Sequence, residues 1–246
     1  MSKKVLWAIK QQTDNPKALD LYLYDNIKSD GEDWWTGETI ESNTSASHVQ
    51  KVLDEATDVE QINIFINSYG GDVKEGLAIY NQLLRCKANK NVYIDGFACS
   101  IASVIAMAGD KIIMGSNTLM MLHHASMGAY GTSAELRKAA DDLDVIDNAS
   151  CSSYKAKAGD KISDEELKTI LDNETWLTAE QCLSYGLCDE IAGSEDKNIT
   201  EAKQRLNNII KQEIEGLEPK PPVPPQFANQ KSNYEKMRQA FIKNIK

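Results

Sequence analysis

Short apolar runs alternate along the chain with stretches in which apolar residues recur every three or four positions. The runs rich in β-forming residues lie at 21–24, 62–66, 91–95, 111–114, 119–122 and 187–191. The stretches with helical spacing lie at about 45–56, 73–86, 101–108, 133–158 and 163–171, with a short one between Thr178 and Gly186. Strands that alternate with helices predict an α/β fold with parallel strands.

Capping residues mark several of the predicted helix starts. Ser47 with Gln50 predicts a capping box near the first helix, and Thr178 with Gln181 predicts one before the short helix. Ser163 precedes three acidic residues, which is typical of a helix start. The small-residue segment 126–131 is predicted to be extended, and the long helix is predicted to begin at Ser133.

The end of the chain differs in kind from the rest. Five of the six prolines lie between Pro219 and Pro225, which predicts a stiff extended linker over 218–226. A charged helix is expected from Thr200 to Glu215, and a basic helix from Asn233 to Lys246. The expected domains are an N-terminal segment (1–19), a core domain (20–193), a C-terminal helix (194–217) and the linker with the basic helix (218–246).

Composition narrows the class of protein. The net charge of −10 over 246 residues disfavours nucleic acid and anionic membranes as partners. No apolar run reaches the roughly 18 residues of a spanning helix, and the first apolar run breaks at Lys10, too early for an export signal. Five cysteines without a CxxC pair and only three histidines suggest neither a metal site nor disulfides. We therefore expect a cytoplasmic protein without a cofactor.

Ser100 is the candidate nucleophile. It lies between the apolar run 91–95 and the small-residue helix 101–108, with Gly96 just upstream to permit a turn. A hydroxyl at such a turn stands clear of the sheet, and the first amides of the helix remain free to bind an oxyanion. A buried turn with a helix-capping serine is the competing interpretation, and Cys99 is a rival nucleophile.

Further candidates lie at other strand ends. Gly70 and Gly71 close the run 62–66 and allow backbone amides to approach a ligand, although two glycines there also fit an ordinary turn. His123 and His124 follow the run 119–122 and should point to opposite faces, so that one can act as a general base; both are otherwise ordinary loop histidines. A third group must then orient the imidazole. Asp172 and Glu174 are the acidic candidates, because the bulk of nearby Trp176 can shield a carboxylate–histidine contact from water.

Taken together, these segments resemble the Clp protease proteolytic-subunit family of serine peptidases. The similarity covers about residues 20–193 in the family's order. It rests on Ile66–Gly71 (Asn-Ser-Pro-Gly-Gly in the family), Gly96–Ala102 (Gly-x-Ala-Ala-Ser-Met-Ala), Asn117–His123 (Asn-x-x-x-Met-Ile-His), Trp176–Glu180 and Tyr185–Asp189.

The resemblance implies a ClpP/crotonase-like α/β fold of repeated ββα units with a protruding strand-helix handle, about 126–158. It implies a triad of Ser100, His123 and Glu174, with Asp172 as the alternative acid, and an oxyanion hole formed by the amides of Gly71 and Ile101. Cys99 falls at an alanine position of the family motif. The resemblance also implies protein or peptide substrates, which the handle strand binds by β-addition, and a homo-oligomeric ring.

The sequence departs from the family pattern at Tyr69 (Pro in the family), His124 (Gln) and Glu174 (Asp). With the Trp34–Trp35 loop and the proline-linked tail, these departures resemble the phage and prophage head maturation branch, whose enzymes cleave capsid or scaffolding proteins. The alternatives are a housekeeping Clp subunit fed by an ATP-driven unfoldase, a catalytically idle assembly protein, and a crotonase-type acyl-CoA enzyme. The Ser/His pair argues against the acyl-CoA enzyme.

Overall fold

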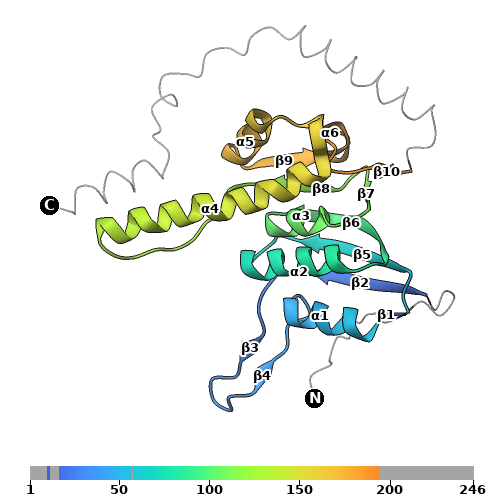
Figure 1. The fold of residues 1–246 in the computed structure, drawn as a ribbon, viewed down its shortest axis with the longest axis horizontal. Helices are drawn as coiled ribbons and strands as arrows, with labels where there is room; N and C mark the ends of the chain where they lie inside the picture. Colours follow the sequence, from blue (N-terminus) through green and yellow to red (C-terminus); the bar gives the residue numbers. More distant parts are fainter. Residues whose placement is uncertain (1–9, 12–16, 57, 194–246) are drawn as a thin grey trace, which may run out of the picture. The chain divides into compact units, whose positions relative to one another are not determined.

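A mixed β-sheet is the centre of the computed structural model, which describes residues 10–11, 17–56 and 58–193 (Figure 1). The main path of the sheet runs β1-β2-β5-β6-β7-β10, and β8 pairs with β6 and with β9. The strands are β1 (Lys10–Gln11), β2 (Ala18–Tyr24), β5 (Gln61–Ser68), β6 (Asn89–Cys99), β7 (Lys111–Gly115), β8 (Leu119–Leu122), β9 (Thr175–Thr178) and β10 (Glu190–Ala192).

Six α-helices accompany this sheet in the described part of the chain. They are α1 (Ala46–Glu55), α2 (Val73–Arg85), α3 (Ile101–Ala106), α4 (Ser133–Ala158), α5 (Asp164–Asp172) and α6 (Ala179–Tyr185), with a 3-10 turn at Gly159–Lys161. The predicted α/β fold is confirmed. The strands β2, β5, β6, β7, β8 and β10 pair in parallel, whereas β1 and β9 pair antiparallel and were not predicted.

The two faces of the sheet differ in what covers them. Helices α1, α2 and α3 lie along one face (Figure 1), where alternate strand residues such as Leu23, Ile64 and Val92 are fully buried. Burial of this apolar surface is the main stabilising contribution to the fold. On the other face, Phe65 stacks between Tyr22 and Tyr93, with ring centroids 4.8 and 5.1 Å apart.

Helix α4 carries the handle, the segment 126–158. The helix is 26 residues long and projects beyond the sheet (Figure 1). Its buried residues, Ser153, Tyr154 and Ala158, all lie near its C-terminal end, so only this end is anchored to the core. The helix begins at Ser133, as predicted, and Thr132 caps it by forming a capping box with Glu135.

Two predicted boundaries are wrong. Helix α1 is capped by Ser45 rather than by Ser47, because the Ser45 side chain accepts the amide of His48. The last strand begins at Glu190 rather than at 187. The amides of Leu187 and Cys188 instead bond to the carbonyl of Cys182 around the C-terminus of α6, so they cannot join the sheet.

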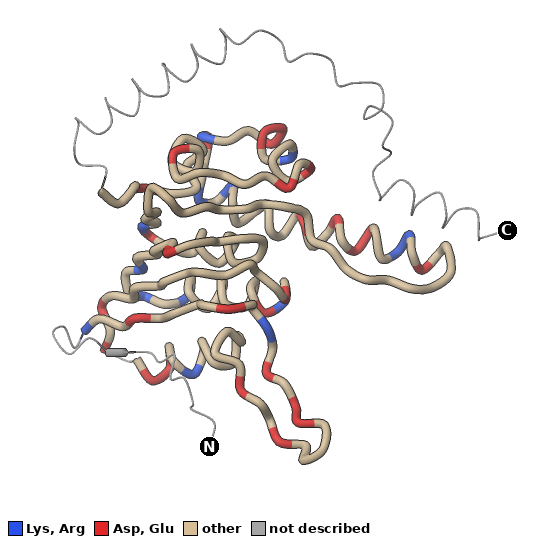
Figure 2. Tube along the Cα trace, turned by 180° about the vertical axis from the view of Figure 1, so that it is seen from behind, with Lys and Arg blue, Asp and Glu red and all other residues tan. Residues whose placement is uncertain are grey.

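A hairpin that was not predicted carries the Trp34–Trp35 loop. Its strands, β3 (Gly31–Glu32) and β4 (Thr39–Ile40), form a separate two-stranded sheet. Trp34 and Trp35 are 87% and 79% exposed. The residues 30–41 include five acidic and no basic side chains, and this acidic strip is visible along the hairpin in Figure 2.

Several expectations fall on residues outside the described ones. The helix expected at 200–215, the proline-rich linker and the basic terminal helix all lie in the undescribed residues 194–246, as does most of the expected N-terminal segment. Among the described helices, none is both long and apolar enough to cross a membrane.

Candidate active site

Ser100 lies in a strained turn between β6 and α3. Its backbone has φ 54° and ψ −131°, a conformation that residues other than glycine rarely adopt. Its side chain makes no capping hydrogen bond, which excludes the competing interpretation of Ser100 as a helix cap. A strained residue with a free hydroxyl at a strand-to-helix turn is the geometry expected of a nucleophile.

Three contacts hold this turn in place. The amide of Ser100 donates to the carbonyl of Met121 on β8 (2.8 Å). The carbonyl of Ser100 accepts the hydroxyl of Ser103 (2.6 Å), which is itself 2.8 Å from the hydroxyl of Tyr154. Because the Ser103 hydrogen is given to Ser100, Tyr154 is the donor to Ser103. Buried Tyr154 on α4 thus links the base of the handle to the nucleophile turn.

Gly70 and Gly71 form the second wall of the site. A Cβ at Gly70 would lie 2.7 Å from the Ser100 Cβ, and a Cβ at Gly71 would lie 2.1 Å from the carbonyl oxygen of Ile27. Both have positive φ, 94° and 145°. The turn therefore packs directly against Ser100, and only glycine fits at either position.

The amides predicted for the oxyanion hole are free to donate. Ile27 donates its amide to the carbonyl of Gly70 and accepts the amide of Asp72 at its own carbonyl. The amide of Gly71, which lies between these two residues, therefore points away from Ile27. The amide of Ile101 is the first of α3 and has no partner within its own helix. Within the described part of the chain neither amide has a hydrogen-bond acceptor. Both can therefore stabilise a developing negative charge.

Cys99 is not placed to compete with Ser100. Its side chain is fully buried in the core, and burial raises the pKa of its thiol to about 11. Because the thiolate is the nucleophilic form of cysteine, Cys99 is inert at neutral pH.

The sheet register brings the three predicted triad members to one edge. Cys99 pairs with Met121 between β6 and β8, and Ser100 and His123 directly follow the last residues of these two strands. Between β8 and β9 the last antiparallel pair is Leu122 with Thr175. One step further along the same register, His123 stands opposite Glu174, and residues opposite each other in an antiparallel pair share a face.

The side chains of the three predicted triad members, all among the described residues, are not hydrogen-bonded to one another. Among the described residues, no hydrogen bond joins Ser100 to His123 or His123 to Glu174. Glu174 is exposed, with φ 48°. Trp176 packs against Phe97 and does not shield Glu174 from water. Free enzymes often hold their catalytic groups loosely until substrate binds.

His124 and Asp172 have other partners. The imidazole Nδ1 of His124 lies 2.8 Å from Asp147 on α4, and its Nε2 lies 2.9 Å from Asp172 on α5. Asp172 also accepts Lys168 at 2.7 Å. Since both ring nitrogens of His124 are engaged, His123 is the histidine that is available as a base. Asp172, the alternative acid, is committed to His124.

An aromatic cluster that was not predicted borders the candidate nucleophile. Phe97 lies edge-to-face between Tyr69 (5.5 Å) and Trp176 (5.3 Å). Tyr69 and Trp176 are 64% and 45% exposed. The three rings come from the glycine turn, the nucleophile strand and β9, so the cluster spans all three elements of the site. Its members are distant in sequence, and only the strand pairing brings them together.

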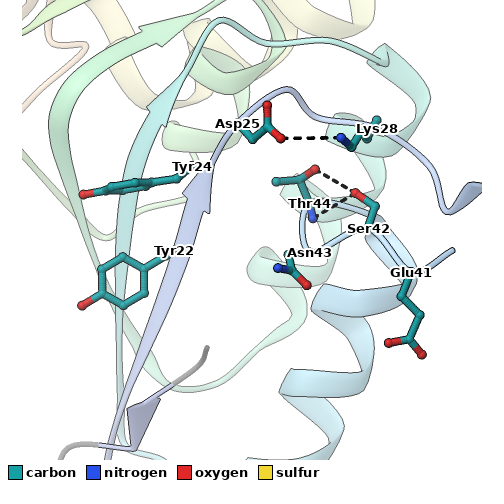
Figure 3. Close-up of a pocket in the computed structure, with 8 residues that line it drawn as sticks. All are labelled: Tyr22, Tyr24, Asp25, Lys28, Glu41, Ser42, Asn43 and Thr44. Carbon is teal, nitrogen blue, oxygen red and sulfur yellow. Dashed lines mark hydrogen bonds and ion pairs between the residues drawn. The ribbon is translucent and has the colours of Figure 1, made fainter. Parts of the chain in front are cut away.

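A pocket of about 500 Å³ lies apart from these residues, between the end of β2 and the segment 41–44 (Figure 3). Tyr22 and Tyr24 line one side, and a Lys28–Asp25 ion pair of 3.5 Å lies at another. None of its lining residues belongs to the predicted site.

The arrangement suits acyl transfer. A free hydroxyl, a neighbouring imidazole and two unpaired amides are the parts that a serine hydrolase needs to attack a carbonyl and stabilise the tetrahedral intermediate. The fold and the site thus place this chain in the class of serine hydrolases.

Comparison with known proteins gives the family. The Clp protease family model matches residues 35–195. The ATP-dependent Clp protease proteolytic subunit of Ligilactobacillus salivarius is 30% identical over 77% of this chain and 95% of its own length. That of Deinococcus radiodurans is 28% identical over 78% of this chain and 94% of its own length.

A solved structure, a ClpP1 mutant from Listeria monocytogenes, shares the fold with a TM-score of 0.58 and 23% identity. The similarity covers 72% of this chain and 92% of that chain. The chain therefore belongs to the Clp protease family, and it is a serine endopeptidase. Members of this family form oligomeric rings that act on protein substrates.

Proposed function

We propose that the chain cleaves proteins with a triad of Ser100, His123 and Glu174. Ser100 attacks the scissile carbonyl, and His123 accepts its proton and later delivers it to the leaving amine. Glu174 orients the imidazole and stabilises its charged form. Water then hydrolyses the acyl-enzyme. The observation that carries this proposal is the pairing register of β6, β8 and β9. Ser100 and His123 directly follow β6 and β8, and Glu174 directly precedes β9, at the same edge of the sheet.

The amides of Gly71 and Ile101 form the oxyanion hole of this mechanism. Each is a fixed donor, and the loss of one such donor typically costs on the order of 3 kcal/mol in transition-state stabilisation. The close packing of Gly70 against Ser100 and Ile101 supports this assignment, because a residue with a Cβ would not fit there.

Labelling with a fluorophosphonate probe tests the nucleophile. Wild-type protein should be labelled on Ser100, and Ser100→Ala should abolish labelling, a loss of at least about 10⁴-fold. Cys99→Ala is the matched neighbouring control and should still be labelled. If Ser100→Ala is labelled like the wild type, the assignment of the nucleophile is wrong.

We further propose that the substrates are capsid or scaffolding proteins, and that the enzyme is a phage or prophage head maturation protease. The support is the set of departures from the family pattern: Tyr69, His124, the Glu174–Trp176 segment, the hairpin with Trp34 and Trp35, and the long tail. The cytoplasm of the bacterial host or an assembling prohead would then be its place of action, and a homo-oligomeric ring its working form.

Co-expression with the capsid and scaffolding proteins encoded beside its gene tests the substrate. Wild-type enzyme should cut one of them, and Ser100→Ala should leave it intact. The alternative is a housekeeping subunit that receives substrates from an ATP-driven unfoldase. That alternative is supported by the names of the curated relatives, which are ATP-dependent Clp protease proteolytic subunits. Intact capsid proteins, together with degradation that depends on an unfoldase and ATP, would favour it.

A further inference from the structure

His124 forms a link between three elements that meet beside the proposed triad. Its Nδ1 contacts Asp147 on the handle helix α4 at 2.8 Å, and its Nε2 contacts Asp172 at the end of α5 at 2.9 Å. Asp147 also accepts the amide of Ala125 at 2.6 Å. The segment that directly follows His123 is therefore tied both to the handle and to the turn that leads to Glu174.

These contacts require the charged form of the imidazole. A neutral imidazole has one N–H, and it can donate to only one of the two carboxylates while its other nitrogen faces the second one with a lone pair. The imidazolium donates to both. The hydrogen bond to Asp172, and then the contacts with Asp147, raise the pKa of His124 against the opposing effect of partial burial.

We propose that the His124 imidazolium is a positioning residue for catalysis: it holds the His123 segment and the Glu174 turn opposite each other. This inference rests on the proposed triad. Asp172 lies two residues before Glu174, and His124 directly follows His123, so a bond between His124 and Asp172 fixes the spacing of the two strand ends. Asp147 makes that spacing depend on the seating of the handle.

The charged groups around His124 come from two elements besides its own. Helix α4 supplies Asp147, with the thiol of Cys151 one turn further along it, and α5 supplies Asp172 and Lys168. Lys168 offsets part of the negative charge of Asp172, and the side chains of His124 and Asp172 are 40% and 47% exposed. The link is therefore weakened by salt.

The sign of the pH dependence follows from the raised pKa. The stabilisation from the link is fully present below the unfolded-state pKa of about 6.5 and is lost as pH rises through the folded-state pKa. Labelling of Ser100 should therefore fall on the alkaline side as His124 loses its proton.

The first test is a titration that needs no activity. The chain has three histidines, so ¹⁵N-imidazole NMR of the wild type, His48→Gln and His124→Gln assigns each signal. The His124 signal should keep the imidazolium pattern to higher pH than a free histidine, and Asp147→Asn or Asp172→Asn should lower its midpoint. A midpoint at or below that of free histidine would overturn the proposal.

The second test measures positioning directly, again without activity. The protection of the Ala125 amide from hydrogen exchange should fall in His124→Gln, and in the wild type above the His124 midpoint. His48→Gln, on α1, should leave this protection unchanged. Unchanged protection in His124→Gln would show that the link positions nothing.

The third test joins the link to catalysis. In His124→Gln the alkaline fall in the rate of fluorophosphonate labelling, expected to be about tenfold for a coupling of ordinary size, should disappear. His48→Gln should keep this alkaline fall. A His124→Gln profile identical to that of the wild type would contradict the proposal. Absence of labelling in the wild type would instead count against the proposed function, and the two structural tests would still decide whether His124 holds the segment.

Discussion

The two sides of the active site are held in different ways. On the nucleophile side, Gly70, Gly71 and Ser100 pack so closely that an added Cβ at either glycine would meet backbone or Ser100 atoms at 2.7 Å or less. On the acid side, Glu174 is exposed, and its strand end is linked to the His123 segment through partly exposed side chains. The proposed oxyanion hole is thus preorganised in the single chain, whereas the proposed base and acid depend on adjustable contacts.

This difference shows which parts of the site tolerate change. Steric fit at the glycine turn admits no substitution, because close-packed interiors relax little. The link on the acid side consists of charged groups whose strength changes with pH, salt and the seating of the handle. The position of Ser100 is therefore fixed by close packing, whereas the positions of His123 and Glu174 can adjust.

The largest effect is expected from removal of the proposed triad acid. Glu174→Gln should slow fluorophosphonate labelling by about 10³-fold, because a neutral amide does not stabilise the imidazolium that forms during attack. Asp172→Asn is the matched comparison and should slow labelling by no more than about tenfold, because its partner is His124. The opposite ranking would transfer the acid's role to Asp172.

The next largest effect is expected for Gly71→Ala. This substitution should lower the rate of labelling by about 10²-fold or more, because the added Cβ would displace the turn that presents the proposed oxyanion donor. Gly128→Ala serves as the control, since a Cβ there has nothing within 4 Å. Equal labelling rates in the two variants would show that the amide of Gly71 takes no part in the reaction.

Tyr154→Phe should lower the free energy of unfolding by about 1 kcal/mol, because it removes one buried hydrogen bond to Ser103. Urea denaturation provides the measurement, and Tyr130→Phe, on a fully exposed ring, should change nothing. No difference between the two variants would mean that the handle is not anchored through this hydroxyl.

The smallest effect tests the strain at the nucleophile. Ser100→Gly should be more stable than Ser100→Ala by about 1 kcal/mol, because glycine adopts positive φ without strain. Both variants lack the hydroxyl, so a comparison of their urea midpoints isolates the backbone term. Equal midpoints would show that the turn stores no strain.

The sequence predicted what depends on local patterns. Apolar runs placed the parallel strands, and the glycines at strand ends marked the turns beside Ser100. Strand β9 was missed because four residues between a helix and a capping box give a weak pattern, and the Ser45 cap because two serines stand two residues apart. The His124 link was also missed, since its members come from three separate elements and no spacing in the chain connects residues 124, 147 and 172.

The burial of Cys99 has a practical consequence for chemical work on this protein. The neighbouring side chains of Cys99 and Ser100 lie in different surroundings, one fully buried in the core and one half-buried at the turn before α3. Burial also raises the pKa of the Cys188 thiol to about 11. Alkylating reagents at neutral pH should therefore spare both buried thiols, so that sensitivity to a serine-directed inhibitor can be interpreted without a contribution from the cysteine next to Ser100.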